Sequence, residues 1–373
     1  MANYVITGNS FRSGLLDELS SNSDYQIFDQ QELSNSDVFF NTEDKIYVTF
    51  EGVIDEVYKH HKDTKWVDKI KLMRNKYEFR KVLKSIYPNF YFEKISSKDI
   101  TQLKIINNKK FVIKPVYGFM ATGVNFTDRS TDLEQIKHKL QEEIAQSARY
   151  FNDSVVSSKV VIIEEFIDGE EYASDCYINS EGEVVILNIT AHPTHEKFHY
   201  MQALYHTNYQ IFSRLYDKIK YILSEFHSLV DISNIPIHAE FKFKDEKLIP
   251  IEFNPLRFGG MGYADLTYYF FEVNPFKVFF EGQNIAPSQL WQGRYDKYFG
   301  WVLAYNGKGL NLNHYEPDYD KIQSKFTNVL KLKKIDYQNS LAFAVLYVEE
   351  KKLENLMQVL KFEFKDFFKK ISA

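Results

Sequence analysis

Short apolar runs alternate with polar, turn-forming stretches through the first 70 residues, a pattern typical of a small α/β unit. The runs at 4–7, 25–28 and 45–50 predict strands, and the stretches at 11–19 and 53–60 predict helices. Gly8 follows the first strand as in a dinucleotide fingerprint. The second and third glycines of that motif are absent, so an ordinary strand-to-helix turn is favoured.

A helix with a clear start signal follows this unit. Asn75 is a good N-cap, and Glu78 lies three residues later, as in a capping box. The next apolar residues fall at helical spacing and form one stripe: Phe79, Val82, Leu83 and Ile86. Lys76 is therefore the first helical residue, where its charge opposes the helix dipole. A solvated lysine that tolerates this position is the ordinary explanation.

The middle of the chain is rich in strand patterns, and the tail repeats them on a smaller scale. Strands are expected at 110–116, 160–167, 173–178, 183–189, 298–305 and 341–348, and helices at 132–151, 209–230 and 351–364. No Pro/Gly/Ser-rich linker separates the parts. The sequence thus predicts an α/β (α+β) protein with regions 1–70, 71–280 and 281–373, the last a small α/β unit that closes back on the rest.

Composition narrows the class of protein. The 373 residues carry a net charge of -5, which excludes a strongly basic nucleic-acid binder. The single cysteine, Cys176, excludes an intramolecular disulfide framework and fits a reducing cytoplasm. The first residues lack the pattern of a secretory signal, and the longest apolar run, 341–348, is too short to span a membrane. We therefore expect a cytoplasmic enzyme or binding protein.

The strongest chemical signal is a predicted hairpin at 235–255. A three-residue turn at 245–247 would pair Phe241 with Ile251 and Phe243 with Ile249 on an apolar face. On the other face Glu240 would oppose Glu252, and His238 would oppose Asn254. Two opposed carboxylates repel each other unless a positive charge lies between them. Two glutamates that splay into water are one explanation, and oxygen ligands for Mg²⁺ are the other.

Two further strands end in residues that suit a nucleotide. Lys114 lies inside the apolar run 111–116, where burial is costly without an anion. The turn from Gly118 to Gly123 could bring backbone N–H groups against phosphate. The run 160–163 leads directly into Glu164, Glu165 and, after Gly169, Glu171. A strand-end lysine with a hairpin turn, and an acidic loop, are the structural alternatives.

In this order, the segments resemble the ATP-grasp superfamily, especially its carboxylate–amine ligases. The resemblance spans roughly residues 70 to 265, behind the Rossmann-like pre-ATP-grasp domain that this family usually has. It rests on Lys76 at a helix start and on the Lys114-Pro115 strand with its small-residue loop. It also rests on the E-x-x-x-G-x-E stretch within 164–171 and on the acidic strand pair with Glu240 and the closing Glu252-Phe253-Asn254-Pro255.

The resemblance implies a role for each matching residue. Lys76 and Lys114 would hold ATP phosphates, and the loop containing Gly118, Thr122 and Gly123 would close over them. The backbone at Glu165 and Ile167 would bind adenine, with Glu164 near its amino group and Glu171 on the ribose. Glu240, Glu252 and Asn254 would hold Mg²⁺, with Mn²⁺ as a substitute. The γ-phosphoryl group would pass to a carboxylate, and an amine would then displace phosphate to give an amide and ADP.

Two stretches depart from the family pattern. Arg257 lies one position later than usual after Asn254-Pro255, and it is the first choice for gripping the substrate carboxylate or the acyl phosphate. The phosphate loop carries Phe119 and Met120 where small residues are common. His192, His195 and His199 fall in a loop at 190–210, in the position of a substrate loop. Their spacing is not that of a standard zinc site, so loop filling or substrate contact is favoured.

Three functions remain open at this point. The first is a ligase for an amino acid or small carboxylate and an amine, with neither nucleic acid nor membrane as partner; the resemblance implies a homodimer, which is common in that family. The second is a small-metabolite kinase on the same scaffold. The third, a binding protein without turnover, is disfavoured because both lysines and all three metal-site candidates are present.

Overall fold

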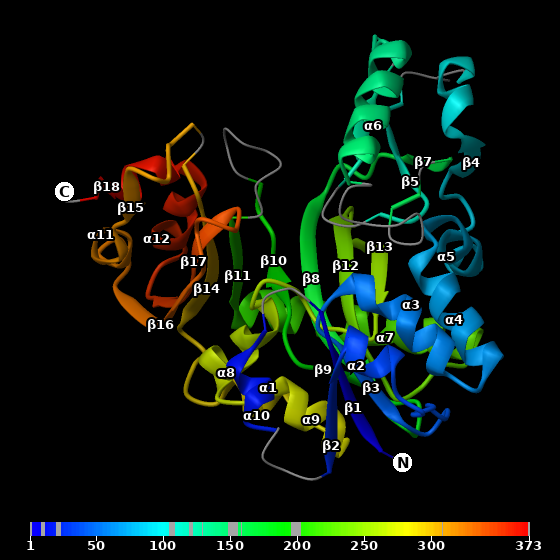
Figure 1. The fold of residues 1–373 in the computed structure, drawn as a ribbon, viewed down its shortest axis with the longest axis horizontal. Coiled ribbons are helices and arrows are strands. Elements are labelled where there is room, and N and C mark those ends of the chain that lie inside the picture. Colours follow the sequence, from blue (N-terminus) through cyan, green and yellow to red (C-terminus); the bar gives the residue numbers. More distant parts are fainter. Residues whose placement is uncertain are drawn as a thin grey trace.

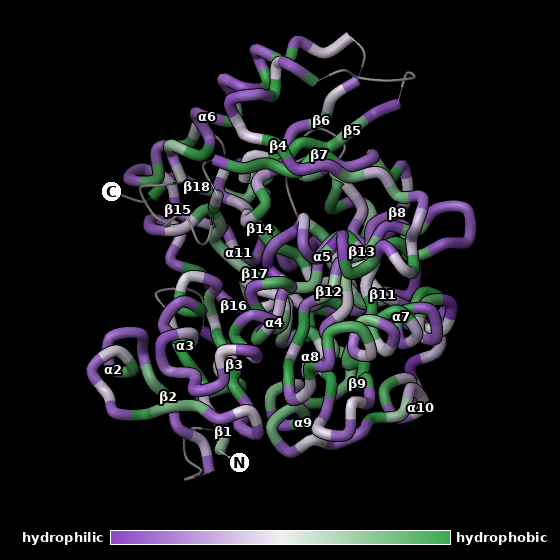
Figure 2. Tube along the Cα trace, turned by 90° about the vertical axis from the view of Figure 1, so that its right-hand side faces the viewer, coloured by the Kyte–Doolittle hydropathy of each residue, from purple (hydrophilic) through white to green (hydrophobic). Residues whose placement is uncertain are grey.

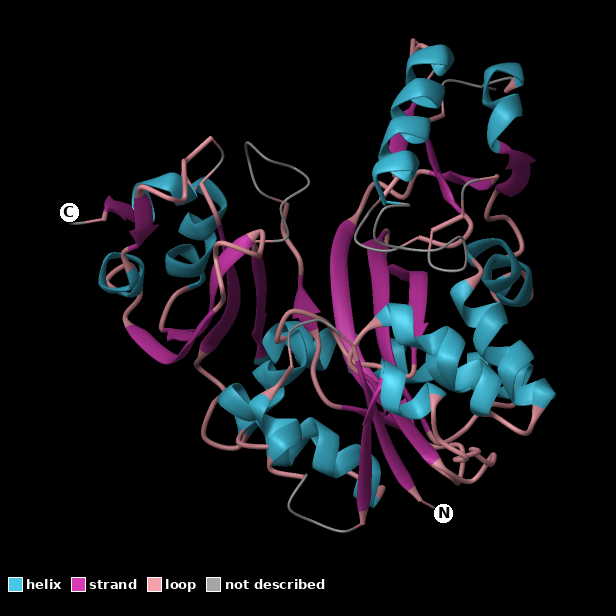
Figure 3. Cartoon of the chain, in the orientation of Figure 1, coloured by secondary structure: helices cyan, strands magenta, loops and turns pink. Residues whose placement is uncertain are grey.

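The computed structural model describes most of the chain. It covers residues 2–8, 12–19, 24–103, 109–118, 122–128, 130–147, 156–157, 159–194, 203–307 and 309–371. Within these ranges the strands form a three-stranded, a four-stranded, a nine-stranded and a two-stranded sheet. In Figure 1 and Figure 3 the nine-stranded sheet extends from the left of the molecule past its centre, with the four-stranded sheet at the upper right and the three-stranded sheet below. The architecture is the mixed α/β arrangement predicted from the sequence.

The N-terminal unit is a parallel sheet of order β2-β1-β3. Its strands are β1 (Asn3–Thr7), β2 (Tyr25–Asp29) and β3 (Lys45–Val48), as the apolar runs predict. The helical segments of this region are α1 (Gly14–Asp17), α2 (Gln30–Ser34), η1 (Glu51–Val53), α3 (Ile54–His60) and α4 (Thr64–Arg74). Parallel strands need crossover connections, which contain α1 between β1 and β2 and α2 between β2 and β3. The α1 helix is shorter than the predicted 11–19, and neither α2 nor α4 was predicted.

A four-stranded antiparallel sheet stands apart from the N-terminal unit at the upper right of Figure 1. Its order is β4-β7-β5-β6, with β4 (Phe92–Ser96), β7 (Val160–Glu165), β5 (Phe111–Pro115) and β6 (Asn125–Thr127). The helices α6 (Leu133–Ser147) and η2 (Ser97–Gln102) complete this part. Their apolar side chains make a separate small core that includes Ile100, Ile113, Leu140 and Val161. We call this part the lid sheet.

The nine-stranded sheet runs in the order β13-β12-β8-β10-β11-β14-β17-β16, and β9 also pairs with β8. Its strands are β8 (Glu170–Ile178), β9 (Val184–Ile186), β10 (Thr190–Ala191), β11 (Leu204–Asn208), β12 (Ile235–Lys244), β13 (Lys247–Pro255), β14 (Tyr298–Tyr305), β16 (Asn328–Lys334) and β17 (Ala342–Glu350). The strands of the C-terminal region thus extend the sheet that carries the predicted metal residues. The C-terminal region closes back on the rest of the chain through these backbone pairs.

The helix α7 (Tyr209–Val230) has the bounds that its amphipathic pattern predicts. Its buried face includes Phe212, Ile219 and Phe226, which belong to the largest apolar core of the molecule. Phe226 and Phe253 of β13 have ring centroids 5.1 Å apart, so α7 covers the apolar face of the sheet. In Figure 2 the hydrophobic segments gather toward the middle of the molecule. The opposite face of β8, β12 and β13 is therefore the one that can carry polar chemistry.

The remaining elements surround the ends of the large sheet. They are α5 (Lys76–Leu83), η3 (Tyr263–Asp265), α8 (Leu266–Phe271), α9 (Pro275–Glu281), α10 (Pro287–Trp291), β15 (Tyr315–Pro317), α11 (Tyr319–Gln323), α12 (Leu353–Met357), η4 (Gln358–Lys361), η5 (Phe364–Phe367) and β18 (Phe368–Lys370). The predicted helix 351–364 is thus broken into a short α-helix and 3₁₀ turns. In the part of the chain that the structure describes, no helix is both long and apolar enough to cross a bilayer.

Candidate active site

The hairpin of β12 and β13 places two glutamates opposite each other. Glu240 pairs with Glu252 and His238 with Asn254, as the sequence predicts. The predicted pairs of Phe241 with Ile251 and Phe243 with Ile249 are wrong. The turn has two residues, because Lys244 pairs with Lys247, and a bulge at Ile251 restores the predicted register beyond it. Pro250 next to the bulge lacks the N–H group that a regular ladder would use.

The two turn residues explain why the predicted length of the hairpin turn is wrong. Asp245 and Glu246 both have positive φ, 49° and 59°, as the two central residues of a tight hairpin turn require. Glycine or asparagine usually marks such a turn, and neither is present. The bulge then moves Leu248 and Pro250 to buried positions and leaves Ile249 only half-buried.

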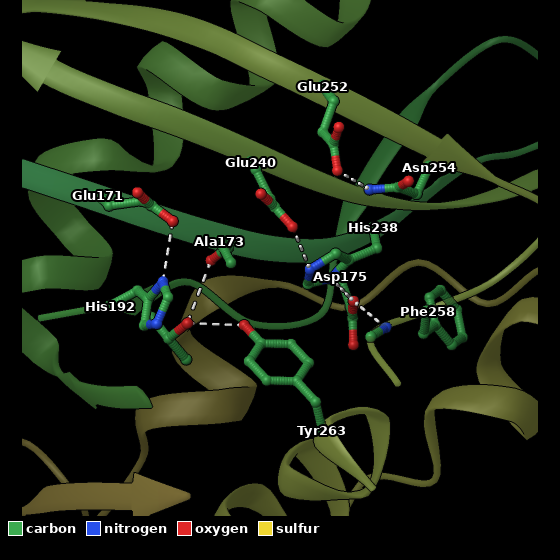
Figure 4. Close-up of polar contacts among 12 residues, drawn as sticks. Glu171, Ala173, Asp175, His192, His238, Glu240, Glu252, Asn254, Phe258 and Tyr263 are labelled. Atoms are coloured by element: carbon green, nitrogen blue, oxygen red, sulfur yellow. Dashed lines mark hydrogen bonds and ion pairs between the residues drawn. The ribbon is translucent and has the colours of Figure 1, made fainter. Parts of the chain in front are cut away.

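A third strand, β8, continues the polar face next to β12. Asp175 pairs with His238, Ala173 with Glu240 and Glu171 with Lys242. Alternate residues of neighbouring strands point to the same side of a sheet. The side chains of Glu171, Asp175, His238, Glu240, Glu252 and Asn254 accordingly gather on one face, as Figure 4 shows.

Glu252 is the carboxylate on which the cations converge. Lys76 Nζ lies 2.8 Å from Glu252 Oε2, and Asn254 Nδ2 donates to Glu252 Oε1 at 3.2 Å. Burial by itself would raise the pKa of Glu252, but the charges of Lys76 and Lys114 outweigh it and lower that pKa to about 2. The lysine ammonium group supplies a positive charge beside one of the two opposed carboxylates.

The donor set of this face fits a hard divalent cation. It offers the carboxylates of Glu240 and Glu252 and the amide oxygen of Asn254, which are oxygen ligands of the kind that Mg²⁺ prefers. No group of three or more His, Cys, Asp and Glu side chains suited to a metal is found among the described residues. Coordination of Mg²⁺ here would therefore need the amide oxygen of Asn254 and further oxygen ligands from a bound phosphate or water.

Lys76 reaches this site from the start of α5. Asn75 caps the helix by accepting from the N–H groups of Tyr77 and Glu78, as predicted. Lys76 Nζ also donates to the carbonyl oxygen of Gly118 at 3.2 Å, which ties α5 to the end of β5. Lys76 is 9% exposed, so the solvated lysine that its position suggested is excluded.

Lys114 and Arg80 hold the second buried carboxylate. Lys114 Nζ lies 2.6 Å from Glu164 Oε2, and Arg80 Nε lies 2.5 Å from Glu164 Oε1. Burial would raise the pKa of Glu164, but these two cations lower it to about 2. Arg80 was missed from the sequence, although it lies one turn after Lys76 on the same helix face. Glu164 thus directs both of its oxygens at cations.

The loop after Lys114 is described in part. Gly118 and Gly123 lie at its ends, whereas Phe119 and Met120 fall outside the described residues. Gly123 has a φ of 74°, and a Cβ there would come within 2.9 Å of Leu140 and Pro115. Only glycine fits this position. Its N–H group donates to Glu143 of α6 at 3.0 Å, so a carboxylate occupies the donor expected to face phosphate. Thr122 is half-buried beside it.

The connection from β7 to β8 borders a pocket of about 470 Å³. Glu165 at the end of β7 and Ile167 in the connection are both half-buried. The N–H of Glu165 donates to the carbonyl oxygen of Tyr91, and the N–H of Phe166 donates to that of Lys110. Glu171 lines the pocket together with His192, His206, Arg214, Lys242 and Met357. The pocket therefore combines residues of the large sheet with α12 from the C-terminal region.

The carboxylate of Glu171 is held by two partners in this pocket. His192 Nδ1 lies 2.9 Å from Glu171 Oε1, and Lys242 Nζ lies 2.9 Å from Glu171 Oε2. Burial would raise the pKa of Glu171, but the hydrogen bond from His192 and the charge of Lys242 lower it to about 2. His192 also stacks on Tyr205 at 4.1 Å. His195 and His199 lie outside the described residues.

Arg257 follows β13 and is anchored by the N-terminal unit. Its Nε lies 3.1 Å from Glu51 Oε2, while Arg74 Nε lies 2.7 Å from Glu51 Oε1. Burial would raise the pKa of Glu51, but Arg74 and Arg257 outweigh it and lower that pKa. Leu256 has a φ of 67°, which is a strained value for a leucine and turns the chain sharply before Arg257. No sequence signal pointed to Glu51, because its partners lie far away in the chain.

Asp175 and His238 form a further buried pair that the sequence did not single out. His238 Nδ1 lies 2.8 Å from Asp175 Oδ1, and His238 Nε2 lies 3.5 Å from Glu240 Oε1. Burial would lower the pKa of His238, but its bonds to Asp175 and Glu240 raise it to about 9. An acid in the middle of the apolar run 173–178 was the available signal, since a buried carboxylate needs a partner. Cys176 beside it is buried, and burial raises the pKa of its thiol, as expected for a packing residue.

The depressed pKa of Glu171 predicts an acid-sensitive contribution to folding. A group with a folded pKa of about 2 and an ordinary value of 4.5 stabilises the protein above pH 4.5, and this is lost toward pH 2. We expect Glu171→Gln to lower the free energy of unfolding at pH 7, and the difference from wild type to shrink as pH falls. Urea unfolding at several pH values measures it. For the exposed Glu246→Gln, the difference in free energy of unfolding from wild type should not change with pH. The same constant difference in Glu171→Gln would contradict the ion-pair explanation.

Comparisons with known proteins place this geometry in context. The family model described as an ATP-grasp domain matches residues 107–265. A search of curated proteins found no match. Among solved structures, an L-amino acid ligase from Bacillus licheniformis shares 15% identity, with a TM-score of 0.69 over 100% of this chain and 99% of that chain.

Two other solved structures have the same overall fold. N5-carboxyaminoimidazole ribonucleotide synthetase from Thermotoga maritima has 12% identity and a TM-score of 0.62, over 100% of both chains. The biotin carboxylase–beta-gamma-ATP complex from Campylobacter jejuni has 11% identity and a TM-score of 0.61, over 98% of this chain and 93% of that chain. The likeness extends well beyond residues 107–265, so the fold of the whole chain is shared.

Proposed function

We propose that this protein, an ATP-grasp protein by its domain and fold, is an ATP-dependent ligase that joins a carboxylate to an amine. The reaction transfers the γ-phosphoryl group of ATP to the carboxylate. The amine then attacks the acyl phosphate and expels phosphate, so the products are an amide, ADP and phosphate. An amino acid is the proposed carboxylate substrate, because the L-amino acid ligase has a similar fold over the whole chain.

One observation carries the proposal. The residues assigned to phosphate and those assigned to the cation meet at a single carboxylate, where Lys76 contacts Glu252 and the charge of Lys114 acts on it as well. Phosphoryl transfer depends mainly on positioning and on compensating charge, so these are the groups it needs. When bound, Mg²⁺ neutralises charge on the phosphates, and we assign Glu240, Glu252 and Asn254 to hold it.

The nucleoside is proposed to lie along the connection from β7 to β8. The backbone at Glu165 and Ile167 would meet the adenine edge. Glu171 lines the adjoining pocket and is more exposed than Glu164, so its oxygens could each accept a second bond, from ribose hydroxyls, beside those from His192 and Lys242. Both oxygens of Glu164 are already bonded to cations, so we propose that it orients Lys114 toward the phosphates and does not bind the adenine amino group directly. The N–H groups of the loop at Gly118 and Thr122 would meet the β- and γ-phosphates. The N–H of Gly123 would join them only after releasing Glu143, to which it donates in this structure.

Arg257 is proposed to grip the substrate carboxylate, with Glu51 holding its guanidinium group. We expect Arg257→Ala to raise KM for the carboxylate about 10- to 100-fold, as for a lost hydrogen bond to a charged group, with KM for ATP nearly unchanged. Steady-state kinetics with each substrate varied in turn measures both constants. Arg294→Ala, which removes an arginine paired with Glu272, is the control. A larger effect on ATP would move Arg257 to the nucleotide.

The deciding experiment measures ADP release with Mg·ATP and pools of amino acids and small carboxylates, with mass spectrometry of the products. A condensed product, formed with ADP only when both a carboxylate and an amine are present, supports the ligase. A stable phosphorylated product that forms without an amine would replace it by a small-metabolite kinase. A protein that neither binds nor turns over ATP under these conditions would refute both.

A further inference from the structure

Asp175 is a fully buried carboxylate with partners on three different segments. Its Oδ1 accepts from His238 Nδ1 at 2.8 Å and from the N–H of Gly259 at 2.9 Å, and its Oδ2 accepts from Asn188 Nδ2 at 3.4 Å. A buried carboxylate is costly unless it is paired with a charge and fully hydrogen-bonded. Asp175 is therefore held rigidly, and whatever it bonds is fixed relative to β8.

Two of its contacts lead to the proposed reaction site. Through His238, Asp175 reaches Glu240, because His238 Nε2 lies 3.5 Å from Glu240 Oε1 (Figure 4). Through the N–H of Gly259, it fixes the chain two residues after Arg257. The side chain of Asp175 thus connects Glu240, a proposed cation ligand, with the loop that contains Arg257, the proposed binding residue for the substrate carboxylate.

We infer that Asp175 and His238 are positioning residues that fix Glu240 for the cation and the Arg257 loop for the carboxylate substrate. The inference rests on the proposed function. Neither residue is assigned a contact with substrate; each acts through a neighbour. Outer partners that orient a ligating group change metal affinity about 10- to 100-fold when they are replaced.

The contact of His238 with Glu240 and the bond from Gly259 to Asp175 can be disturbed separately. Tyr263 packs edge-on against the ring of His238 at 5.1 Å and bonds Asn188 and Thr190, so the ring has little freedom to turn. His238→Asn places an amide where Nδ1 stands and keeps a donor for Asp175, but it cannot reach Glu240. His238→Gln places an amide near the position of Nε2 and keeps a donor toward Glu240. Asp175→Asn weakens both the bond from His238 and the bond from the N–H of Gly259.

The first test is binding of Mn²⁺, followed by electron paramagnetic resonance, to protein saturated with adenylyl imidodiphosphate. We expect His238→Asn to weaken Mn²⁺ binding at least about tenfold and His238→Gln to weaken it less. KM for the carboxylate should stay within about twofold in His238→Asn and rise in Asp175→Asn, because only the latter disturbs the bond to Gly259. His227→Asn on α7, away from the polar face, is the matched control.

Some outcomes would overturn the inference. An unchanged Mn²⁺ affinity in His238→Asn would overturn it. It would also be overturned if Mn²⁺ affinity and KM for the carboxylate changed together in His238→Asn, His238→Gln and Asp175→Asn, because that result indicates a general loss of structure. If His238→Asn does not fold, the Asp175→Asn, His238→Asn double variant leaves no unpaired buried charge and takes its place.

A measurement on the native protein stands independently of folding in the variants. The NMR signals of the His238 ring should shift when Mg²⁺ and adenylyl imidodiphosphate are added, and an unshifted ring would overturn the inference. Failure of wild-type protein to bind Mn²⁺ with the nucleotide would instead refute the proposed function. The two failures are therefore distinguishable.

Discussion

Glu252→Gln is expected to lower kcat/KM for ATP by about 100- to 1,000-fold, the range seen when one preorganised electrostatic contact is removed from an active site. The substitution keeps the size of the side chain but removes the charge on which Lys76 and Lys114 converge. It also removes one of the two opposed carboxylates, so the Mg²⁺ concentration needed for half-maximal rate should rise. Initial rates of ADP release at varied ATP and Mg²⁺ measure both effects.

The hairpin itself offers a matched control for this change. Glu246→Gln alters a glutamate at the exposed turn of the same two strands, and it should keep wild-type kinetics. Thermal unfolding of both variants shows whether the fold persists. A folded Glu252→Gln enzyme with kcat/KM near that of wild type would remove Glu252 from the site, and the assignment of Glu240 and Asn254 would fall with it.

Lys114→Met is expected to lower kcat by a similar factor, about 100- to 1,000-fold. The methionine fills the same space in β5 but cannot compensate charge on the phosphoryl group during transfer. Glu164 keeps its bond to Arg80, so its carboxylate is not left unpaired and the lid sheet should remain folded. Turnover rate and calorimetric binding of adenylyl imidodiphosphate together separate a defect in chemistry from a defect in binding.

Lys94→Met provides the comparison for this second variant. Lys94 is exposed on β4 of the same lid sheet, so its replacement should change neither turnover nor nucleotide binding. Near-normal kcat in Lys114→Met would show that Lys114 is only the structural partner of Glu164. Loss of nucleotide binding with unchanged kcat at saturation would assign Lys114 to ground-state binding alone.

The site is assembled from parts that are distant in sequence. The lid sheet contributes Lys114 and Glu164, α5 contributes Lys76 and Arg80, and the N-terminal unit holds Arg257 through Glu51. A further cluster joins Asp265 to Ser13 of the N-terminal unit and Lys333 of β16. These polar contacts tie the three predicted regions of the chain together.

Local chemistry made part of this site predictable. The assumed three-residue turn placed Glu240 opposite Glu252 and His238 opposite Asn254. These pairs are found because the bulge at Ile251 offsets the shorter, two-residue turn. The cap at Asn75 placed Lys76 at the start of α5 for an equally local reason. The pairing failed only toward the turn, where two residues adopt positive φ without the glycine or asparagine that usually announces it.

The sequence by itself determined the strands of the N-terminal unit, the hairpin of β12 and β13, the long helix α7 and the capped start of α5, because each depends on neighbours within a few residues. The strands β4, β6, β10, β11, β15, β16 and β18 were not predicted. Only the tertiary structure decided which charges pair. Glu51 meets Arg257 206 residues away, and Arg80 meets Glu164 84 residues away. Such pairs form because a buried charge must find an opposite charge wherever the fold brings one, and no local pattern encodes that partner.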